Sequence, residues 1–133
     1  MRAVDTNLLV RTLTGDDPVQ SPAAEAFIRA HAPVWVSHLV LVETVWVLDS
    51  VYGCGRPRLV AALDRILDNR DLALEDPQVV RSALALYRAK GKINFEDCMI
   101  LEVARKAGHL PLATFDKALG RADGARGLWT AGP

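Results

Sequence analysis

The sequence lacks an excess of charge of either sign. Lys and Arg together number 16, Asp and Glu also number 16, and the formal net charge is +0. The composition therefore gives no electrostatic argument for nucleic acid, a membrane surface or an acidic partner. Any such partner has to be inferred from where the charges lie along the chain.

Cysteine is scarce and histidine is scattered. Cys54 and Cys98 have no metal-ligand spacing, and in a reducing compartment we expect two buried thiols, with a disulfide as the alternative. The histidines show no HxxxH or HxH spacing. Because zinc sites usually need His and Cys ligands, the sequence argues against one.

Long apolar runs and phosphate-binding loops are also missing. The longest apolar run, residues 39–48, is interrupted by Glu43 and Thr44 and is too short to span a bilayer. The start of the chain carries Asp5 and no signal-peptide stretch, so we expect a soluble, cytoplasmic protein with no membrane contact. Neither GxxxxGK(S/T) nor GxGxxG occurs, and "VDTN" lacks the second Asp of haloacid-dehalogenase phosphatases.

The chain alternates between short strands and helices over 133 residues, half of them apolar, and we expect a single domain, residues 1–133. The expected strands are residues 1–4, 33–37, 72–74, 110–113 and 127–130. The expected helices are residues 7–13, 22–30, 39–52, 57–67, 77–90, 95–107 and 117–119. Strands separated by helices imply right-handed crossovers, so the predicted fold class is three-layer α/β/α with a mostly parallel central sheet.

Some of these helices have distinctive ends or faces. Ser21 followed by Pro22 is typical of an N-cap and a first-turn proline. Residues 39–52 are apolar nearly all round, which predicts a helix that is buried on every side. Gly108 is placed to end the helix over residues 95–107.

Two carboxylates follow predicted strands: Asp5 after "RAV" and Asp116 after "LPLATF". Ligands of open parallel sheets bind beyond the carboxyl ends of the strands, which makes both residues candidates for a site. The alternative is that each is only an N-cap, worth about 1 kcal/mol.

Glu43 lies within "LVLVETVWVL", where an unpaired ionised carboxylate would cost several kcal/mol if it were buried. We therefore expect Glu43 to have a partner or to face a water-filled cleft. The alternatives are a buried ion pair with an Arg, or a helix that turns this face to solvent.

Asp97 has both a structural and a functional interpretation. Asn94 can cap the helix, and Asp97 stands three residues later, where a capping-box carboxylate reaches back. Projected at about 100° per residue, Glu102 and Arg105 share a polar face, whereas Asp97 falls near Ala104 on the apolar face. A carboxylate used only for capping is free to face water, so we expect Asp97 to point into the interior or a cleft.

If these acids converge, like charges about 4 to 6 Å apart raise each other's pKa and destabilise the fold unless a cation lies among them. Carboxylate oxygens and water are the ligands that Mg²⁺ and Mn²⁺ prefer. Such a cluster suits metal-assisted attack of water on a phosphodiester, because the metal activates the nucleophile and offsets charge in the transition state.

Four features occur in a telling order: "VDTN", Glu43 in a central apolar helix, "NFEDCMILEVA" and "LATFDKAL". In this order they resemble a PIN-domain ribonuclease, specifically the VapC-type toxin of bacterial toxin–antitoxin pairs, over essentially the whole chain. The resemblance implies four carboxylates that are both catalytic and metal-binding: Asp5, Glu43, Asp97 and Asp116.

The resemblance also implies supporting residues. Thr114 is the hydroxyl beside the last acid, and Asn7 is placed to orient the Asp5 carboxylate or its water. In many relatives the position of Asn94 is acidic. Here the amide leaves the helix cap intact and removes one charge, so the number of metal ions stays open.

The activity implied by the resemblance is that of a Mg²⁺- or Mn²⁺-dependent endoribonuclease. It implies a cognate, VapB-like antitoxin whose C-terminal segment blocks the acidic site, and a homodimer. Independently, residues 39–52 present more apolar surface than one small core is expected to cover. The alternative is that this surface is simply core.

RNA binding requires cations, and nine Lys or Arg outnumber five acids between Pro77 and Arg126. With Asp97 and Asp116 neutralised by metal, this half becomes a phosphate track. The cations expected to lead it are Arg88, Lys90, Lys92, Lys117 and Arg121. The alternatives are solvated surface charges and, for the whole chain, a non-catalytic PIN-like module that binds RNA or a protein.

Overall fold

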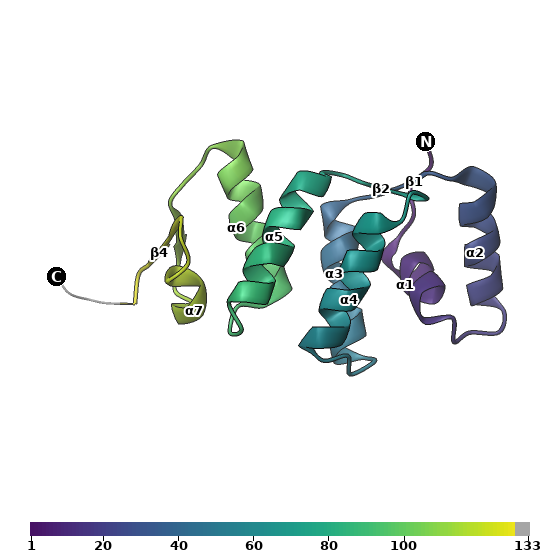
Figure 1. The fold of residues 1–133 in the computed structure, drawn as a ribbon, viewed down its shortest axis with the longest axis horizontal. Helices are drawn as coiled ribbons and strands as arrows, with labels where there is room; N and C mark the ends of the chain where they lie inside the picture. Colours follow the sequence, from purple (N-terminus) through teal and green to yellow (C-terminus); the bar gives the residue numbers. More distant parts are fainter. Residues whose placement is uncertain (130–133) are drawn as a thin grey trace. The chain divides into compact units, whose positions relative to one another are not determined.

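The computed structural model describes residues 1–129, which contain seven α-helices and four short strands (Figure 1). Contacts divide the chain into two compact units, Met1–Pro77 and Gln78–Pro133. We call them the first and the second unit and describe each by itself. Within residues 1–129, no helix combines the length and the apolar character needed to cross a membrane.

The first unit, all of whose residues are described, contains four helices and one parallel pair of strands. Strand β1 (Val34–Val36) runs parallel to β2 (Leu72–Leu74), with Val34 opposite Leu72. The helices are α1 (Thr6–Thr14), α2 (Gln20–His31), α3 (His38–Ser50) and α4 (Arg56–Asp68). Both strands lie where the sequence predicts them.

The segment before α1 is extended, but it pairs with β1 only through a single parallel bridge between Ala3 and Trp35. The amide of Val4 donates to the carbonyl of Trp35 at 3.2 Å. The next residue, Asp5, is already the N-cap of α1, and its Oδ1 accepts from the amide of Leu8 at 2.9 Å. The expected full strand over residues 1–4 is therefore wrong, because the helix cap ends the pairing after one bridge.

The start of α2 differs from the prediction. Ser21 is not the N-cap: the helix begins at Gln20, and Ser21 is buried, its hydroxyl donating to the carbonyl of Arg11 at 2.8 Å. The carboxylate of Asp17 binds the helix start instead, accepting from the amides of Val19 at 2.9 Å and Gln20 at 2.7 Å. These hydrogen bonds lower the pKa of Asp17.

Helix α3 forms as predicted, but it is not buried on every side. Leu41 and Leu48 are buried, whereas Leu39 is 84% exposed, Trp46 is 60% exposed and Val51, just beyond the helix, is 68% exposed. The interpretation of an apolar helix as a fully covered one is therefore wrong: one face packs into the core, and the opposite face carries large apolar side chains in contact with solvent.

The second unit contains a helical pair followed by a small parallel pair of strands. Its described elements are α5 (Pro77–Ala89), α6 (Phe95–Ala107), β3 (Leu112–Thr114), α7 (Lys117–Gly120) and β4 (Ala125–Gly127). Strand β3 runs parallel to β4. The last expected strand, residues 127–130, lies two residues earlier at its start, and Thr130 falls outside the described residues.

Both ends of α6 lie where the sequence predicts them. The side chain of Asn94 caps the helix, its Oδ1 accepting from the amide of Asp97 at 2.8 Å. Gly108 ends the helix with a φ of 82°, in the left-handed region that favours glycine. The tight ends fix the position of Asp97 in the first turn of α6.

The predicted faces of α6 are wrong. Glu102, expected on the solvent face, is only 8% exposed, whereas Ile100 of the expected apolar face is 45% exposed. Burial of Glu102 is compensated by Arg105, whose Nε donates to Glu102 Oε1 at 3.0 Å. Arg105 also donates to the carbonyl of Asp123 at 2.6 Å, so the pair ties α6 to the loop before β4.

Each unit has its own apolar core. In the first unit the fully buried side chains include Leu9, Leu63 and Ile66, and in the second they include Leu101 and Cys98. The two cysteines, residues 54 and 98, are free and buried, as the sequence predicts.

Candidate functional site

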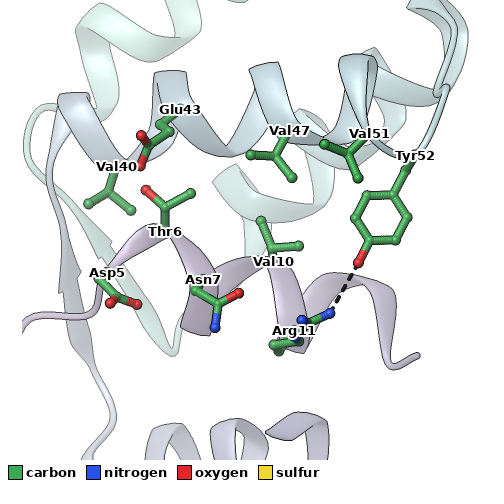
Figure 2. Close-up of a pocket in the computed structure, with 10 residues that line it drawn as sticks. All are labelled: Asp5, Thr6, Asn7, Val10, Arg11, Val40, Glu43, Val47, Val51 and Tyr52. Carbon is green, nitrogen blue, oxygen red and sulfur yellow. Dashed lines mark hydrogen bonds between the residues drawn. The ribbon is translucent and has the colours of Figure 1, made fainter. Parts of the chain in front are cut away.

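A cavity of about 560 Å³ lies in the first unit between α1 and the length of α3 (Figure 2). It brings together three of the residues that the sequence singles out: Asp5, Asn7 and Glu43. The complete lining is Asp5, Thr6, Asn7, Val10, Arg11, Val40, Glu43, Val47, Val51 and Tyr52.

Asp5 reaches this cavity because it caps α1. Its Oδ1 is bound to the amide of Leu8, which fixes the carboxylate at the first turn of the helix. The residue is exposed, and its Oδ2 has no hydrogen-bond partner among residues 1–129. The N-cap interpretation of Asp5 is correct, and it leaves one carboxylate oxygen available to a ligand.

Glu43 projects from α3 into the same cavity, opposite Thr6 (Figure 2). It is exposed, and among the described residues it forms no ion pair with an Arg or Lys. Glu43 thus faces solvent at this cleft, which fits the expected cleft and equally the alternative of a helix that turns this face to solvent. A buried Arg–Glu pair is not the explanation.

Asn7 has a different first partner from the one expected. Its Nδ2 donates to Oε1 of Gln20 on α2 at 3.3 Å. The same oxygen accepts from Arg11 Nε at 2.8 Å. The bond to Gln20 fixes the amide plane of Asn7, and the side chain makes no hydrogen bond to the Asp5 carboxylate among residues 1–129.

The second unit holds the other two candidate acids. Asp116 follows β3 and caps α7, its Oδ1 accepting from the amide of Leu119 at 2.8 Å. The hydroxyl of Thr114 accepts from the amide of Asp116 at 3.0 Å. Thr114 therefore holds the backbone of the acid, and Asp116 Oδ2 has no partner among the described residues of the unit.

Asp97 is half-buried and has a perturbed protonation equilibrium. Burial raises the pKa of its carboxyl above the ordinary value, and the negative charges of Asp116 and Glu96 raise it further. Its carboxylate makes no capping-box bond back to Asn94 among residues 1–129; the cap is formed by the Asn94 side chain alone. The charge of Asp116 is therefore one of the two that disfavour ionisation of Asp97.

The donor chemistry of both acidic pairs suits a hard divalent cation, because all available ligand atoms are oxygens. The repulsion that raises the pKa of Asp97 is the kind that a bound cation relieves. Within residues 1–129, no three His, Cys, Asp or Glu side chains lie close enough together to form a metal site by themselves.

Three of the five cations expected to contact RNA share one cavity. Lys90, Lys92 and Arg121 line a space of about 250 Å³ formed by the turn after α5 and by α7. Arg121 also donates to the carbonyl of Lys117 at 3.5 Å. Arg88 and Lys117 are exposed and lie outside this lining.

Sequence reasoning missed three residues of the first cavity: Thr6, Arg11 and Tyr52. Thr6 is part of the quoted "VDTN", so it could have been included. Arg11 had a weaker signal, a single cation within the apolar run that follows Asp5. Tyr52 had none, because its contact with Arg11 joins residues that are 41 positions apart.

A protein-family model described as the PIN domain matches residues 2–125, which is nearly the whole chain. No protein with a curated description matches the sequence. PIN domains are generally nucleases and typically use divalent metal ions. The seven helices and the parallel strand pairs of residues 1–129 are consistent with the predicted three-layer α/β/α fold.

Proposed function

The chain belongs to the PIN-domain family, and we propose that it is a cytoplasmic Mg²⁺- or Mn²⁺-dependent endoribonuclease, the toxin of a type II toxin–antitoxin pair. The observation that carries the proposal is the cleft in which Asp5 and Glu43 face solvent from two different helices. Family membership supports the nuclease chemistry, and this cleft offers the free Oδ2 of Asp5 and the carboxylate of Glu43, which forms no ion pair among residues 1–129.

We take residues 1–133 as one PIN-like domain, since the family match spans the boundary between the two units. The proposed metal ligands and catalytic residues are Asp5, Glu43, Asp97 and Asp116. This grouping follows the resemblance in sequence order. When bound, the divalent ion supplies an activated water and offsets charge on the phosphate.

The chain's own contribution is to hold the ligand atoms ready. Asp5 and Asp116 are each fixed by one amide through Oδ1, so a ligand can bind Oδ2 without a further loss of side-chain freedom. Thr114 holds the backbone of Asp116. Asn7 lines the cleft together with Asp5, and we assign it the role of orienting that carboxylate or its water. The Asn94 side chain is committed to the cap of α6, so we assign it a positioning role.

The same proposal includes RNA as the substrate, an antitoxin as the inhibitor and a second copy of the chain as a partner. Lys90, Lys92 and Arg121 converge on one cavity and are placed to bind RNA phosphates, with Arg88 and Lys117 as further cations. A VapB-like antitoxin would inhibit the enzyme by covering the acidic residues. The exposed apolar face of α3 supports a homodimer, because large exposed apolar patches mark interfaces.

Replacing Trp46 by Glu is expected to raise the dimer dissociation constant at least about tenfold, because a charge replaces an aromatic anchor in a desolvated interface. Sedimentation velocity over a range of concentrations measures the shift. Ala26→Glu, which adds the same charge at an exposed position of α2, serves as the matched control and should sediment like the wild type. A Trp46→Glu protein that dimerises normally would rule out this face.

Cleavage of RNA by the purified protein in Mn²⁺ or Mg²⁺, with EDTA as the control, tests the proposed activity directly. Calorimetric titration with Mn²⁺ separates it from the non-catalytic module. The enzyme should bind Mn²⁺, and Asp97→Asn should weaken that binding. RNA binding without detectable Mn²⁺ binding or cleavage would favour the module.

A further inference from the structure

The cleft of the first unit has two ends of opposite charge. Asp5 and Glu43 lie at one end, and Arg11 and Tyr52 lie at the other (Figure 2). Between them lie Asn7 and Val10 from α1, and the apolar side chains of Val47 and Val51 from α3 and its end. The acids account for the metal-binding end, but they leave the cationic end without a role.

Arg11 is held rigidly at that end. Its Nε donates to Gln20 Oε1 at 2.8 Å, and its Nη1 donates to the hydroxyl of Tyr52 at 3.3 Å. Its Nη1 also forms an ion pair with Oδ1 of Asp16, at 3.6 Å. Its Nη2 has no hydrogen-bond partner among residues 1–129, and the side chain is 27% exposed, so a ligand can reach these donors.

The counter-charge of Arg11 lies outside the cleft. Asp16 accepts from Tyr52 at 3.0 Å and lines a separate cavity with Arg58 and Arg65. Arg11 therefore presents the guanidinium to the cleft while its anionic partner does not enter the lining. An anion in the cleft would meet a cation that is already oriented and partly desolvated, which strengthens a charge-assisted hydrogen bond.

The separation along α1 suits a strand of RNA. Asp5 and Arg11 are six positions apart, and a rise of 1.5 Å per residue places them about 9 Å apart along the helix axis. A phosphate at Arg11 would thus belong to a neighbour of the nucleotide whose phosphate lies at the acidic end.

We propose that Arg11 binds the phosphate of a nucleotide flanking the cleavage site, so that the cleft from Asp5 to Tyr52 is a substrate-binding groove for single-stranded RNA. The valines of the lining contact the intervening ribose, and Tyr52 is a positioning residue that orients Arg11. This inference rests on the proposed ribonuclease function. The competing explanation is that Arg11 only ties α1 to α2 and to the end of α3.

The test is the binding of a short, fluorescein-labelled, mixed-sequence single-stranded RNA, measured by anisotropy in EDTA over a range of salt concentrations. Arg11→Gln should raise the Kd about tenfold, because one charge-assisted contact is lost. It should also reduce the slope of log K against log salt by about 0.7, the value for one phosphate contact with a single strand. Arg29→Gln, an exposed arginine of α2 outside the cleft, is the matched control and should change neither quantity.

Thermal unfolding of each variant identifies a purely structural effect. If Arg11→Gln does not fold, Arg11→Lys replaces it: the salt slope should stay near that of the wild type, while the Kd should rise about threefold because the bidentate fork is lost. A folded Arg11→Gln protein with the wild-type Kd and slope, or a folded Arg11→Lys protein whose Kd does not rise, would overturn the inference and leave the proposed function intact. A wild-type protein that neither binds nor cleaves RNA would overturn both.

Discussion

Replacing Asp5 by Asn is expected to lower the rate of metal-dependent RNA cleavage by about a hundredfold to a thousandfold. The variant removes the charge that we propose binds the metal, and it changes little else. Asn is as good an N-cap as Asp, so its side-chain oxygen keeps the bond to the amide of Leu8. Steady-state cleavage rates in Mn²⁺, measured together with a thermal melt, separate loss of chemistry from loss of fold.

Asp17→Asn is the matched control for this experiment. Asp17 also caps a helix of the first unit, accepting from the amides of Val19 and Gln20, but it does not line the cleft. Its substitution should leave cleavage within about twofold of the wild type, because Asn keeps the helix cap and Asp17 does not line the cleft. Full activity in Asp5→Asn would show that Asp5 is only a cap.

The second large effect is expected at Asp97, where activity and stability should change in opposite directions. Asp97→Asn should reduce cleavage by about a hundredfold or more, as for the other ligands. In EDTA the same variant should melt at a higher temperature than the wild type at neutral pH. Burial and the charges of Asp116 and Glu96 disfavour the ionised carboxylate in the folded protein, and Asn cannot ionise.

The pH dependence of this difference follows from the direction of the shift. The pKa of Asp97 is raised in the folded protein above its ordinary 3.8, so the folded state binds the proton more tightly than the unfolded chain. The wild type therefore loses stability as the pH rises from below 3.8 through the raised pKa, and the loss is complete above that pKa. The gap in melting temperature between the variant and the wild type should vanish at the acidic end.

Glu96→Gln is the control for Asp97, because Glu96 is the neighbouring carboxylate in the same helical turn and is exposed. It should keep its cleavage activity and show a smaller change in melting temperature. An Asp97→Asn protein that melts below the wild type at neutral pH would contradict the claim that ionised Asp97 destabilises the fold. An Asp97→Asn protein that remains fully active would contradict its proposed role in cleavage.

Local signals predicted the elements well. Asn94 and Gly108 mark α6 to the residue, because a side-chain cap and a left-handed glycine act on their own helix ends. The prediction that Ser21 is an N-cap was wrong because its hydroxyl donates to the carbonyl of Arg11 in the preceding helix. Asp17 accepts from the amide of Gln20 at the start of α2 instead. Capping signals are reliable when no tertiary partner competes for the side chain.

Burial was harder to predict than secondary structure. Helical projection put Glu102 and Arg105 on one polar face, but it does not show that Glu102 is buried there. Arg105 also donates to the Asp123 carbonyl, a contact with the loop before β4 that the projection does not contain. The apolar residues of α3 suggested cover on all sides, yet Trp46 and Leu39 remain exposed. Amphipathic projection ranks residues by hydropathy and contains no information about what packs against them.

In the cavity between α1 and α3, some of the lining residues could be predicted from the sequence and others could not. The sequence indicated that Glu43 has a partner, a cleft or a solvent-facing helix around it, and the structure exposes Glu43 at a cavity that Asp5 and Asn7 also line. The sequence gave no reason to connect Arg11 with Tyr52, because their hydrogen bond depends on how α1 packs against the end of α3. Carboxylates in apolar segments are visible in a sequence because their burial is costly.

The central claim is that this PIN domain cleaves RNA with a divalent metal held by its acidic residues. The most direct measurement is the incubation of total RNA with folded protein, stripped of any bound antitoxin, in Mn²⁺, in Mg²⁺ and in EDTA, alongside Asp97→Asn. The account predicts discrete fragments in the presence of metal that disappear with the chelator and in the variant. Intact RNA under every condition, or cleavage that persists in EDTA and in Asp97→Asn, would contradict it.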